Sequence, residues 1–266
     1  MFLTRFRINP ARRDARKLLG SPQVMHAAVL AGFPRPEDHT RPAERTQPPG
    51  RAELPGRAEL PGRGELPGRG ELPGRGELPG RAQPPARTLW RLDQGADSRV
   101  TLYIASPTKP DLTHLVEQAG WPTTDTWLTK PYQPFLDILQ EGQQWAFRLT
   151  ANPVRNGRPA QGGDTRRYGH VTTDHQIQWL LARQQRNGFA VADQSDGRPN
   201  LSLHRRQTLT FAHGQGQRPV TLATATFDGV LTIQDVVPFR GMLMSGIGHA
   251  RAYGCGLLTL APLRRQ

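Results

Sequence analysis

Three groups of residues in this chain of 266 have types and spacing that suit binding or catalysis at a phosphate. The first is a glycine loop that reads GIGHARAYGCG between Gly246 and Gly256. Glycines let backbone N–H groups approach a phosphate closely, and Arg251 adds positive charge. The loop residues from which we expect phosphate contacts are Gly246, Gly248, His249, Arg251, Gly254 and Gly256. A tight, packed turn between a helix and a strand is the alternative interpretation of the same pattern.

His26 is the second candidate, because it lies in the first or second turn of an expected helix that Ser21 would cap and Pro22 would begin. A helix N-terminus attracts phosphate and lowers the pKa of a nearby histidine toward its neutral, basic form. Such a histidine suits RNA cleavage by the substrate's own 2′-hydroxyl. That reaction needs a base, an acid and donors for the phosphorane charge, but no metal. A histidine packed for structure alone remains the alternative.

Dispersed arginines form the third group, and they indicate a polyanionic partner. Some lie in an expected Gly-rich loop and the others on an expected hairpin around residues 213–217. We expect RNA contacts from Arg155, Arg158, Arg166, Arg167, Arg205, Arg206 and Arg218, with His204 and His213 as further candidates. Phosphate contacts of this kind supply affinity and salt dependence. A solvated basic face explains single members equally well, but the net charge of +13 makes it a weak explanation for all of them.

The chain lacks the residues that several classes of protein function require. The single cysteine, Cys255, excludes an internal disulfide and a cysteine-built metal site, and no HExxH motif is present. The glycine loop lacks the Walker lysine and the acidic partner of a dinucleotide fingerprint, and no Gly-x-Ser-x-Gly elbow occurs. We therefore expect no metal and no cofactor. Without an apolar run of 18 residues or a signal-peptide core, we also expect no membrane association and a cytoplasmic location.

Residues 35–87 differ in composition from the rest of the chain. From Gly50 they repeat the hexapeptides GRAELP and GRGELP, and they contain no aromatic residue. A proline in every unit interrupts helices and sheets, and one leucine per unit buries too little surface to offset chain entropy. We therefore expect a disordered insertion, with a dedicated binding arm as the alternative. The segment has ten Arg against eight acidic residues, so about +11 of the +13 belongs to the other 213 residues.

The elements that position the candidate residues form two similar series. In the first, alternation over residues 2–8 predicts a strand that buries Phe2, Thr4, Phe6 and Ile8. The other expected elements are helices at 12–19, 22–32 and 110–119 and strands at 88–93, 99–106 and 127–130. Their order is β-α-β-β-α-β, the ferredoxin-like order.

The second series begins near residue 143. We expect strands at 143–151, 189–192, 203–211, 220–227, 230–233 and 257–261, with helices at 173–187 and 235–244. Thr173 would cap the longer helix and Gly188 would end it. The sequence therefore predicts an α+β fold of two tandem ferredoxin-like domains. They span 1–140, with the insertion at 35–87, and 141–266, with the glycine loop and an extra hairpin.

Four segments, in the right order, resemble the CasE family, the CRISPR repeat-processing endoribonucleases of type I-E systems. The most specific is GIGHARAYGCGLLTLAP, from Gly246 to Pro262. AFRLTANPV at 146–154 resembles the strand that opens the family's second domain, and FDGVLTI at 227–233 resembles its late strand. The amino-terminal strand followed by Met25 and His26 resembles its catalytic region.

The resemblance implies RAMP-type ferredoxin-like domains that bind the repeat stem-loop of precursor CRISPR RNA. It implies one metal-independent cut at the 3′ base of the stem, leaving a 2′,3′-cyclic phosphate or 3′-phosphate, and retention of the product as a subunit of Cascade. His26 falls where the family carries its catalytic histidine. Where the family often has a tyrosine, this chain has Gln23, which donates a hydrogen bond but does not transfer protons at neutral pH. Lys17, with Arg16, is a candidate to stabilise the phosphorane, and His249 is a candidate to reach the same site.

Two rival functions remain at this point. One is a non-cleaving RNA-binding subunit of the same fold, which loss of cleavage on substitution of His26 would distinguish. The other is a nucleotide-utilising enzyme that employs the glycine loop, against which the missing Walker lysine argues.

Overall fold

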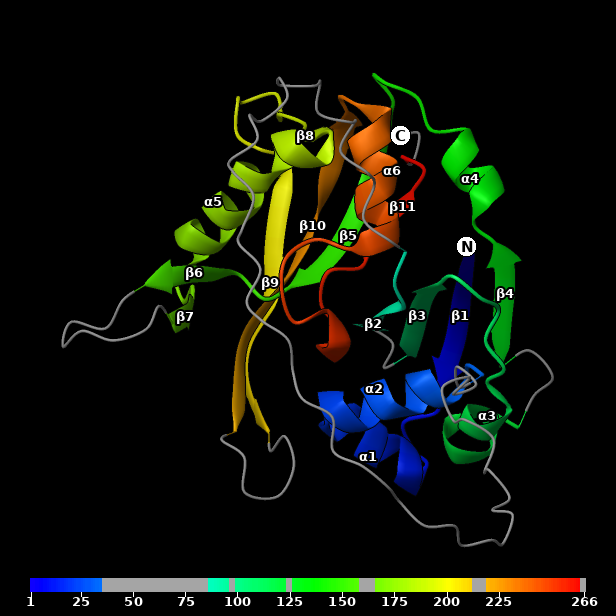
Figure 1. The fold of residues 1–266 in the computed structure, drawn as a ribbon. Helices are drawn as coiled ribbons and strands as arrows, with labels where there is room; N and C mark the ends of the chain where they lie inside the picture. The colour runs from blue at the N-terminus through cyan, green and yellow to red at the C-terminus, as the bar shows by residue number, and fades with distance from the viewer. Residues whose placement is uncertain (35–85, 96–98, 123–125, 158–165, 212–218, 264–266) are drawn as a thin grey trace, which may run out of the picture. The chain divides into compact units, whose positions relative to one another are not determined.

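The computed structural model describes residues 1–34, 86–95, 99–122, 126–157, 166–211 and 219–263 (Figure 1). The hexapeptide repeat, and with it the expected disorder, lies outside these residues. Residues 86 and 87, at the expected end of the insertion, are described, and the Arg87 N–H donates to the Met244 carbonyl at 3.3 Å. The limits of the insertion stay a prediction. None of the helices in the described part of the chain has the length and apolar character that crossing a bilayer requires.

The first sheet is antiparallel and has the strand order β2-β3-β1-β4. Its strands are β1 (Phe2–Ile8), β2 (Leu89–Gln94), β3 (Val100–Ser106) and β4 (Trp127–Pro131). The alternation in β1 is confirmed, because Phe6 and Ile8 are buried while Arg5 and Arg7 are exposed. This order, with β1 and β3 central, is that of a ferredoxin-like sheet.

Helices cover one face of the first sheet and supply its core. They are α1 (Arg13–Gly20), α2 (Pro22–Ala31) and α3 (Thr113–Ala119), followed by a one-turn α4 (Gln133–Asp137) after β4. Ser21 caps α2 as expected, because its Oγ accepts a hydrogen bond from the Val24 N–H. Met25 and Val29 of α2 pack with Phe6 and Leu102 of the sheet. Because Met25 and Val29 face this core, the packing sets which side of α2 points away from the first sheet.

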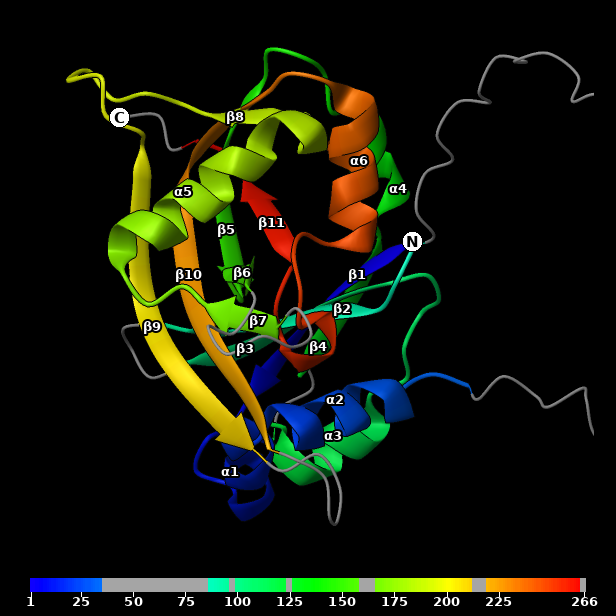
Figure 2. The ribbon, with the colours of Figure 1, turned by 60° about the vertical axis from the view of Figure 1, so that its left-hand side comes forward.

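The second sheet repeats the same arrangement, in the order β11-β5-β10-β8, with β9 also paired to β10. Its strands are β5 (Gln144–Ala151), β8 (Phe189–Val191), β9 (Leu201–Phe211), β10 (Val220–Ile233) and β11 (Leu258–Ala261). Two helices, α5 (Thr173–Gln184) and α6 (Val236–Ser245), cover one face (Figure 2). Short 3-10 turns follow as η1 (Gln185–Asn187) and η2 (Arg251–Tyr253). The expected α+β fold with two ferredoxin-like units is confirmed. The division at residues 140 and 141 falls between the two sheets and stays a prediction.

Local details of the second sheet differ from expectation. β10 is one strand rather than two, because Asp228 and Gly229 continue its pairing with β5. Thr172, not Thr173, caps α5, and its Oγ1 accepts from the His175 N–H. The segment expected as a Gly-rich loop contains a hairpin of β6 (Val154–Gly157) and β7 (Arg166–Gly169).

Arg91, a fully buried residue of β2, joins the two sheets. Its guanidinium pairs with Asp93 through two hydrogen bonds of 2.6 and 2.8 Å. It also donates to the Arg148 carbonyl on β5, to the Leu257 carbonyl and to Thr259 Oγ1 on β11. A buried charge needs such partners, so the first sheet is held to the second at β5 and β11.

Candidate functional site

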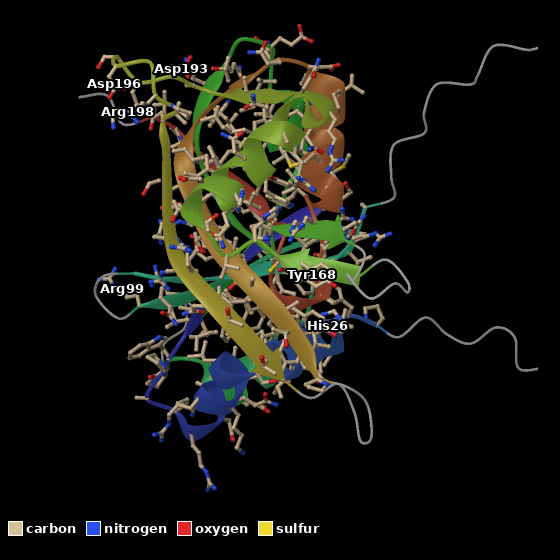
Figure 3. The ribbon with its side chains drawn as sticks, turned by 90° about the vertical axis from the view of Figure 1, so that its left-hand side faces the viewer. His26, Arg99, Tyr168, Asp193, Asp196 and Arg198 are labelled. Atoms are coloured by element: carbon tan, nitrogen blue, oxygen red, sulfur yellow. The ribbon has the colours of Figure 1, made fainter. Side chains whose placement is uncertain are left out.

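His26 lies in the second turn of α2, half-buried, next to the core residue Met25. Its Nδ1 is buried and has no hydrogen-bond partner among the described residues. Burial lowers the pKa of the imidazole, because desolvation disfavours the charged form. The ring is therefore neutral at neutral pH, the state that a general base requires. Figure 3 shows His26 on α2, below the hairpin that carries Tyr168.

The aromatic neighbour of His26 is Tyr253, in η2 of the glycine loop. The two rings meet edge to face with centroids 6.4 Å apart. Tyr253 also meets Phe211 of β9 in the same manner, at 4.9 Å. The contact brings together a helix of the first sheet and a loop near the end of the chain. Sequence reasoning missed Tyr253, whose one signal was an aromatic residue within the glycine loop.

Beside Tyr253 a small cavity of about 160 Å³ separates the α1–α2 corner from the second sheet. Gly20 and Pro22 line it on one side, and Arg205 and Thr224 line it on the other. His26 does not line this cavity. The candidate site therefore adjoins a partly open cavity that Tyr253 and Met25 both line.

The glycines of the loop fit against large neighbouring rings. Gly248 and Gly254 have φ values of +82° and +79°. A Cβ on Gly248 would meet the Trp179 ring at 2.8 Å, and one on Gly254 would meet the Trp90 ring at 2.6 Å. Only glycine combines this backbone conformation with this closeness. These contacts favour the packed-turn interpretation for both glycines, and phosphate contact by the loop stays a prediction.

Three polar residues of the loop differ in how far they are enclosed. Arg251 is half-buried, its Nε has no partner among the described residues, and burial together with the charge of Arg87 lowers its pKa. His249 is exposed and forms an isolated β-bridge with Asn152. Cys255 is fully buried, and burial raises the pKa of its thiol to about 12. Cys255 is therefore a neutral thiol at neutral pH and does not act as a thiolate nucleophile.

Lys17 and Gln23 are not joined to His26 by any hydrogen bond or ion pair within the described residues. Lys17 Nζ lies 2.9 Å from Asp14 Oδ1 on an exposed face of α1, with 65% of its side chain accessible. Such an exposed ion pair is weak and leaves the ammonium free to rearrange. Gln23 is half-buried in the first turn of α2. Catalytic roles for both residues stay predictions.

Two of the expected RNA-binding arginines make bonds within the protein. Arg205, at φ +49° beside a bulge in the β9–β10 pairing, donates to the side chain and carbonyl of Gln94. Arg206 donates to Gln176 Oε1 at 3.0 Å and to the Val171 carbonyl. These bonds connect β9 to β2 and to α5. Sequence reasoning did not foresee this structural use.

The other expected RNA contacts are only partly described. The Arg155 guanidinium lies over the Tyr168 ring, 5.8 Å from its centroid. His204 Nε2 lies 2.9 Å from Asp228 Oδ2, and Asp228 also pairs with Arg148. The residues whose side chains lie outside the described part of the chain are Arg158, Arg166, Arg167, His213 and Arg218. Within the described residues, no group of three or more His, Cys, Asp or Glu side chains could hold a metal ion.

Comparison with known proteins gives a match along nearly the whole chain. The model of the family described as "CRISPR associated protein" matches residues 1–47 and 76–262. The CRISPR-associated endoribonuclease Cse3 of Thermus thermophilus is 25% identical over 270 residues, covering 98% of this chain and 100% of the relative. The CRISPR system Cascade subunit CasE of Escherichia coli is 34% identical over 132 residues, covering 47% of this chain and 61% of the relative.

The fold is similar to a solved structure of the Thermus thermophilus protein. Cse3 bound to an RNA representing a pre-cleavage complex superposes with a TM-score of 0.65 at 26% identity, covering 98% of both chains. The similarity extends over both sheets and over the elements that carry His26 and Tyr253.

Proposed function

Because the chain belongs to the CRISPR associated protein family, we propose that it is the endoribonuclease that processes precursor CRISPR RNA within Cascade. It binds the stem-loop of the CRISPR repeat and cuts the RNA at the 3′ base of the stem. The observation that carries this proposal is the half-buried, neutral His26 against Tyr253, in a fold similar over 98% of the chain to an RNA-bound Cse3.

The reaction needs no metal, because the RNA supplies its own nucleophile. The 2′-hydroxyl loses its proton, its oxygen bonds to the adjacent phosphorus, and the bond from phosphorus to the 5′-oxygen breaks. The leaving 5′-oxygen takes a proton from water, and the upstream fragment ends in a 2′,3′-cyclic phosphate that water can open to a 3′-phosphate. Neutral His26 accepts the 2′-hydroxyl proton. Nε2 is the nitrogen that reaches the RNA, because Nδ1 is buried.

Cations of the chain stabilise the charge that develops on the phosphorane. Lys17 on α1 precedes the helix of His26, and exchange of its exposed Asp14 partner for a phosphate costs little. Arg251 lies two residues before Tyr253 in η2 and is the cation that the glycine loop supplies. The Gly246 and Gly256 N–H groups donate to the Met242 and Thr150 carbonyls instead. Gln23 orients the phosphate through its amide. Fixed donors of this kind stabilise a transition state because they need no reorganisation.

The RNA stem is held by shape and charge. Duplex RNA exposes its phosphates and 2′-hydroxyls rather than distinct base edges, so arginines on rigid strands suit it. The candidate contacts are Arg155 on β6, Arg205 and Arg206 on β9, and, from their place in the sequence alone, Arg158, Arg166, Arg167 and Arg218. The product stays bound and meets the other Cascade subunits, in the cytoplasm.

The decisive experiment incubates the chain with its neighbouring repeat RNA in EDTA and analyses the fragment ends. One cut at the stem foot with a cyclic or 3′-phosphate is expected. His26→Ala abolishes the cut and keeps the affinity, whereas His39→Ala, in the insertion, changes neither. Unchanged cleavage by His26→Ala would remove this histidine from the mechanism.

One observation favours an alternative, a non-cleaving RNA-binding subunit. Within the described residues, no second titratable side chain forms a hydrogen bond with His26, and Gln23 cannot transfer a proton at neutral pH. The same incubation decides between the two functions. Tight binding of the repeat RNA without any cleavage by the unaltered protein would establish the alternative.

A further inference from the structure

A basic cavity borders the glycine loop at His249. Its volume is about 370 Å³, and β6, α5 and the loop contribute its walls. The side chains that matter are Arg155, His170, His175, Trp179, Arg183 and His249. All the titratable side chains that line it among the described residues are Arg or His. A cavity with five basic groups and no lining carboxylate favours an anion.

Arg183 is held in place while part of its hydrogen-bonding capacity is unused. Its guanidinium lies over the Trp179 ring, 4.3 Å from the centroid, and Nη1 donates to the Trp179 carbonyl. Its buried Nε has no partner among the described residues. A stacked guanidinium with donors to spare is pre-organised for phosphate, because little side-chain freedom is lost on binding.

The histidines of this cavity are also fixed. The rings of His170 and His175 lie 5.6 Å apart between centroids. His175 Nδ1 is in a 2.8 Å hydrogen bond with Thr172 Oγ1, which leaves Nε2 as its unused nitrogen among the described residues. Gln176 Nε2 donates to the His170 carbonyl at 2.7 Å and anchors that segment to α5. The two imidazoles therefore present donors from a rigid frame.

The cavity is short of negative charge. The pKa of His170 is lowered, first by burial and then by the positive charges of His175, Arg155 and Arg183. Arg183 has a lowered pKa as well, through burial and through Arg186. An anion in the cavity would relieve both repulsions.

We propose that this cavity binds a backbone phosphate of the RNA, distinct from the phosphate that is cut. The inference rests on the proposed function, because it takes the RNA as the source of the phosphate. His249 belongs to the same loop that places Tyr253 against His26, so one loop contacts both sites. The cavity is therefore a positioning site, which holds the RNA while cleavage occurs at His26.

The test measures binding and cleavage separately. Repeat RNA with a 2′-deoxy nucleotide at the cut site gives the Kd without cleavage, and single-turnover assays with saturating unmodified RNA give the cleavage rate. Arg183→Gln should raise Kd about tenfold, because a charge-assisted contact is lost. The slope of log K against log salt should fall by about 0.7–0.9 for one lost phosphate contact. The saturated cleavage rate should not change.

Arg198→Gln is the matched control, since it removes the same charge from a different place. Arg198 is exposed, pairs with Asp196, and lies far from Tyr168 in Figure 3. Arg183→Lys should recover part of the affinity, because it keeps the charge without the planar donors. Thermal melting of each variant identifies any loss of fold. His170→Asn gives an independent measurement if Arg183→Gln is unstable.

The pH dependence adds a readout that a purely structural role would not move. A bound phosphate raises the pKa of His170, which faces Arg155 from β6, His175 and Arg183 from α5, and His249 from the loop. RNA affinity should therefore increase as pH falls from about 8 to about 5.5. His170→Asn should flatten this increase.

Three outcomes would overturn the inference or its premise. Equal Kd and salt slope for Arg183→Gln and Arg198→Gln, with the unaltered protein still binding RNA, would overturn the phosphate site alone. Shifts of the His170 and His175 NMR signals with inorganic phosphate, without any change in RNA affinity in Arg183→Gln, would reassign the cavity to free phosphate. Failure of the unaltered protein to bind any repeat RNA would overturn the proposed function itself.

Discussion

The imidazole of His26 and the phenol ring of Tyr253 meet edge to face, 6.4 Å apart between centroids. One ring comes from the second helix of the chain and the other from the loop before its last strand. The candidate site is therefore complete only when both sheets are assembled. The orientation of His26 depends on residues that the local sequence around it does not contain.

Loss of the Tyr253 ring should slow cleavage without weakening RNA binding. An edge-to-face aromatic pair contributes about 0.5–1.5 kcal/mol beyond buried area, so Tyr253→Ala should lower the single-turnover rate by about two- to tenfold. Tyr253→Phe keeps the ring and should retain most of the rate. A large loss in Tyr253→Phe as well would mean that the hydroxyl, rather than the ring, is what the reaction needs.

Cleavage should lose activity only at acidic pH. Burial lowers the pKa of His26, so the neutral base persists below the ordinary histidine value of about 6.5. The single-turnover rate should be level near neutral pH and fall as pH drops through the lowered pKa. The same shift makes protonation of His26 destabilise the folded chain, so its contribution to stability is present above about pH 6.5 and lost below the folded pKa.

A pH–rate profile at saturating RNA checks this prediction, with melting temperatures measured in the same buffers. His26→Ala should flatten the part of the acid destabilisation that comes from this residue. A rate that instead falls as pH rises through the titration of His26 would contradict a base of this kind and would indicate that His26 acts as the protonated acid.

Substitution of Gly254 should destabilise the protein more than substitution of Gly142. Both glycines have φ +79°, so an added Cβ costs about 1–2 kcal/mol of backbone strain at either position. At Gly254 the Cβ would also meet the Trp90 ring at 2.6 Å, whereas at Gly142 nothing lies within 4 Å. Overpacking should therefore add about 1–3 kcal/mol to the loss in Gly254→Ala. Urea unfolding of both variants measures the difference, and equal losses would mean that Trp90 moves aside freely.

Removal of residues 35–85 should leave folding and cleavage nearly intact. The segment offers little apolar surface to bury, and the entropic cost of a loop grows slowly with its length. The variant joins residues 34 and 86 through a flexible linker, and its melting temperature and cleavage rate are compared with those of the full chain. A deletion variant that folds but does not cleave would show that the repeat serves as a binding arm.

Much of the fold was predictable because its elements carry local signals. Alternation marks β1, and the Ser21–Pro22 pair marks the start of α2. The β6–β7 hairpin was missed because its four-residue strands are rich in Arg and Gly rather than in β-branched residues. His26 was identifiable from its helical position, but its contact with Tyr253 depends on tertiary packing. The bonds of Arg205 and Arg206 to Gln94 and Gln176 were hidden for the same reason.

The single cysteine makes the opening of the glycine loop measurable by chemical labelling. Cys255 is buried in the loop that contacts His26 and lines the basic cavity, and the chain has no other thiol to compete for a reagent. A thiol reagent reacts only when the loop opens, so the rate of labelling equals the intrinsic rate multiplied by the fraction of time that the loop is open. RNA that contacts the loop both at Tyr253 and at His249 would lower the fraction of time that the loop is open. The fall in the Cys255 labelling rate would then report RNA binding as it occurs.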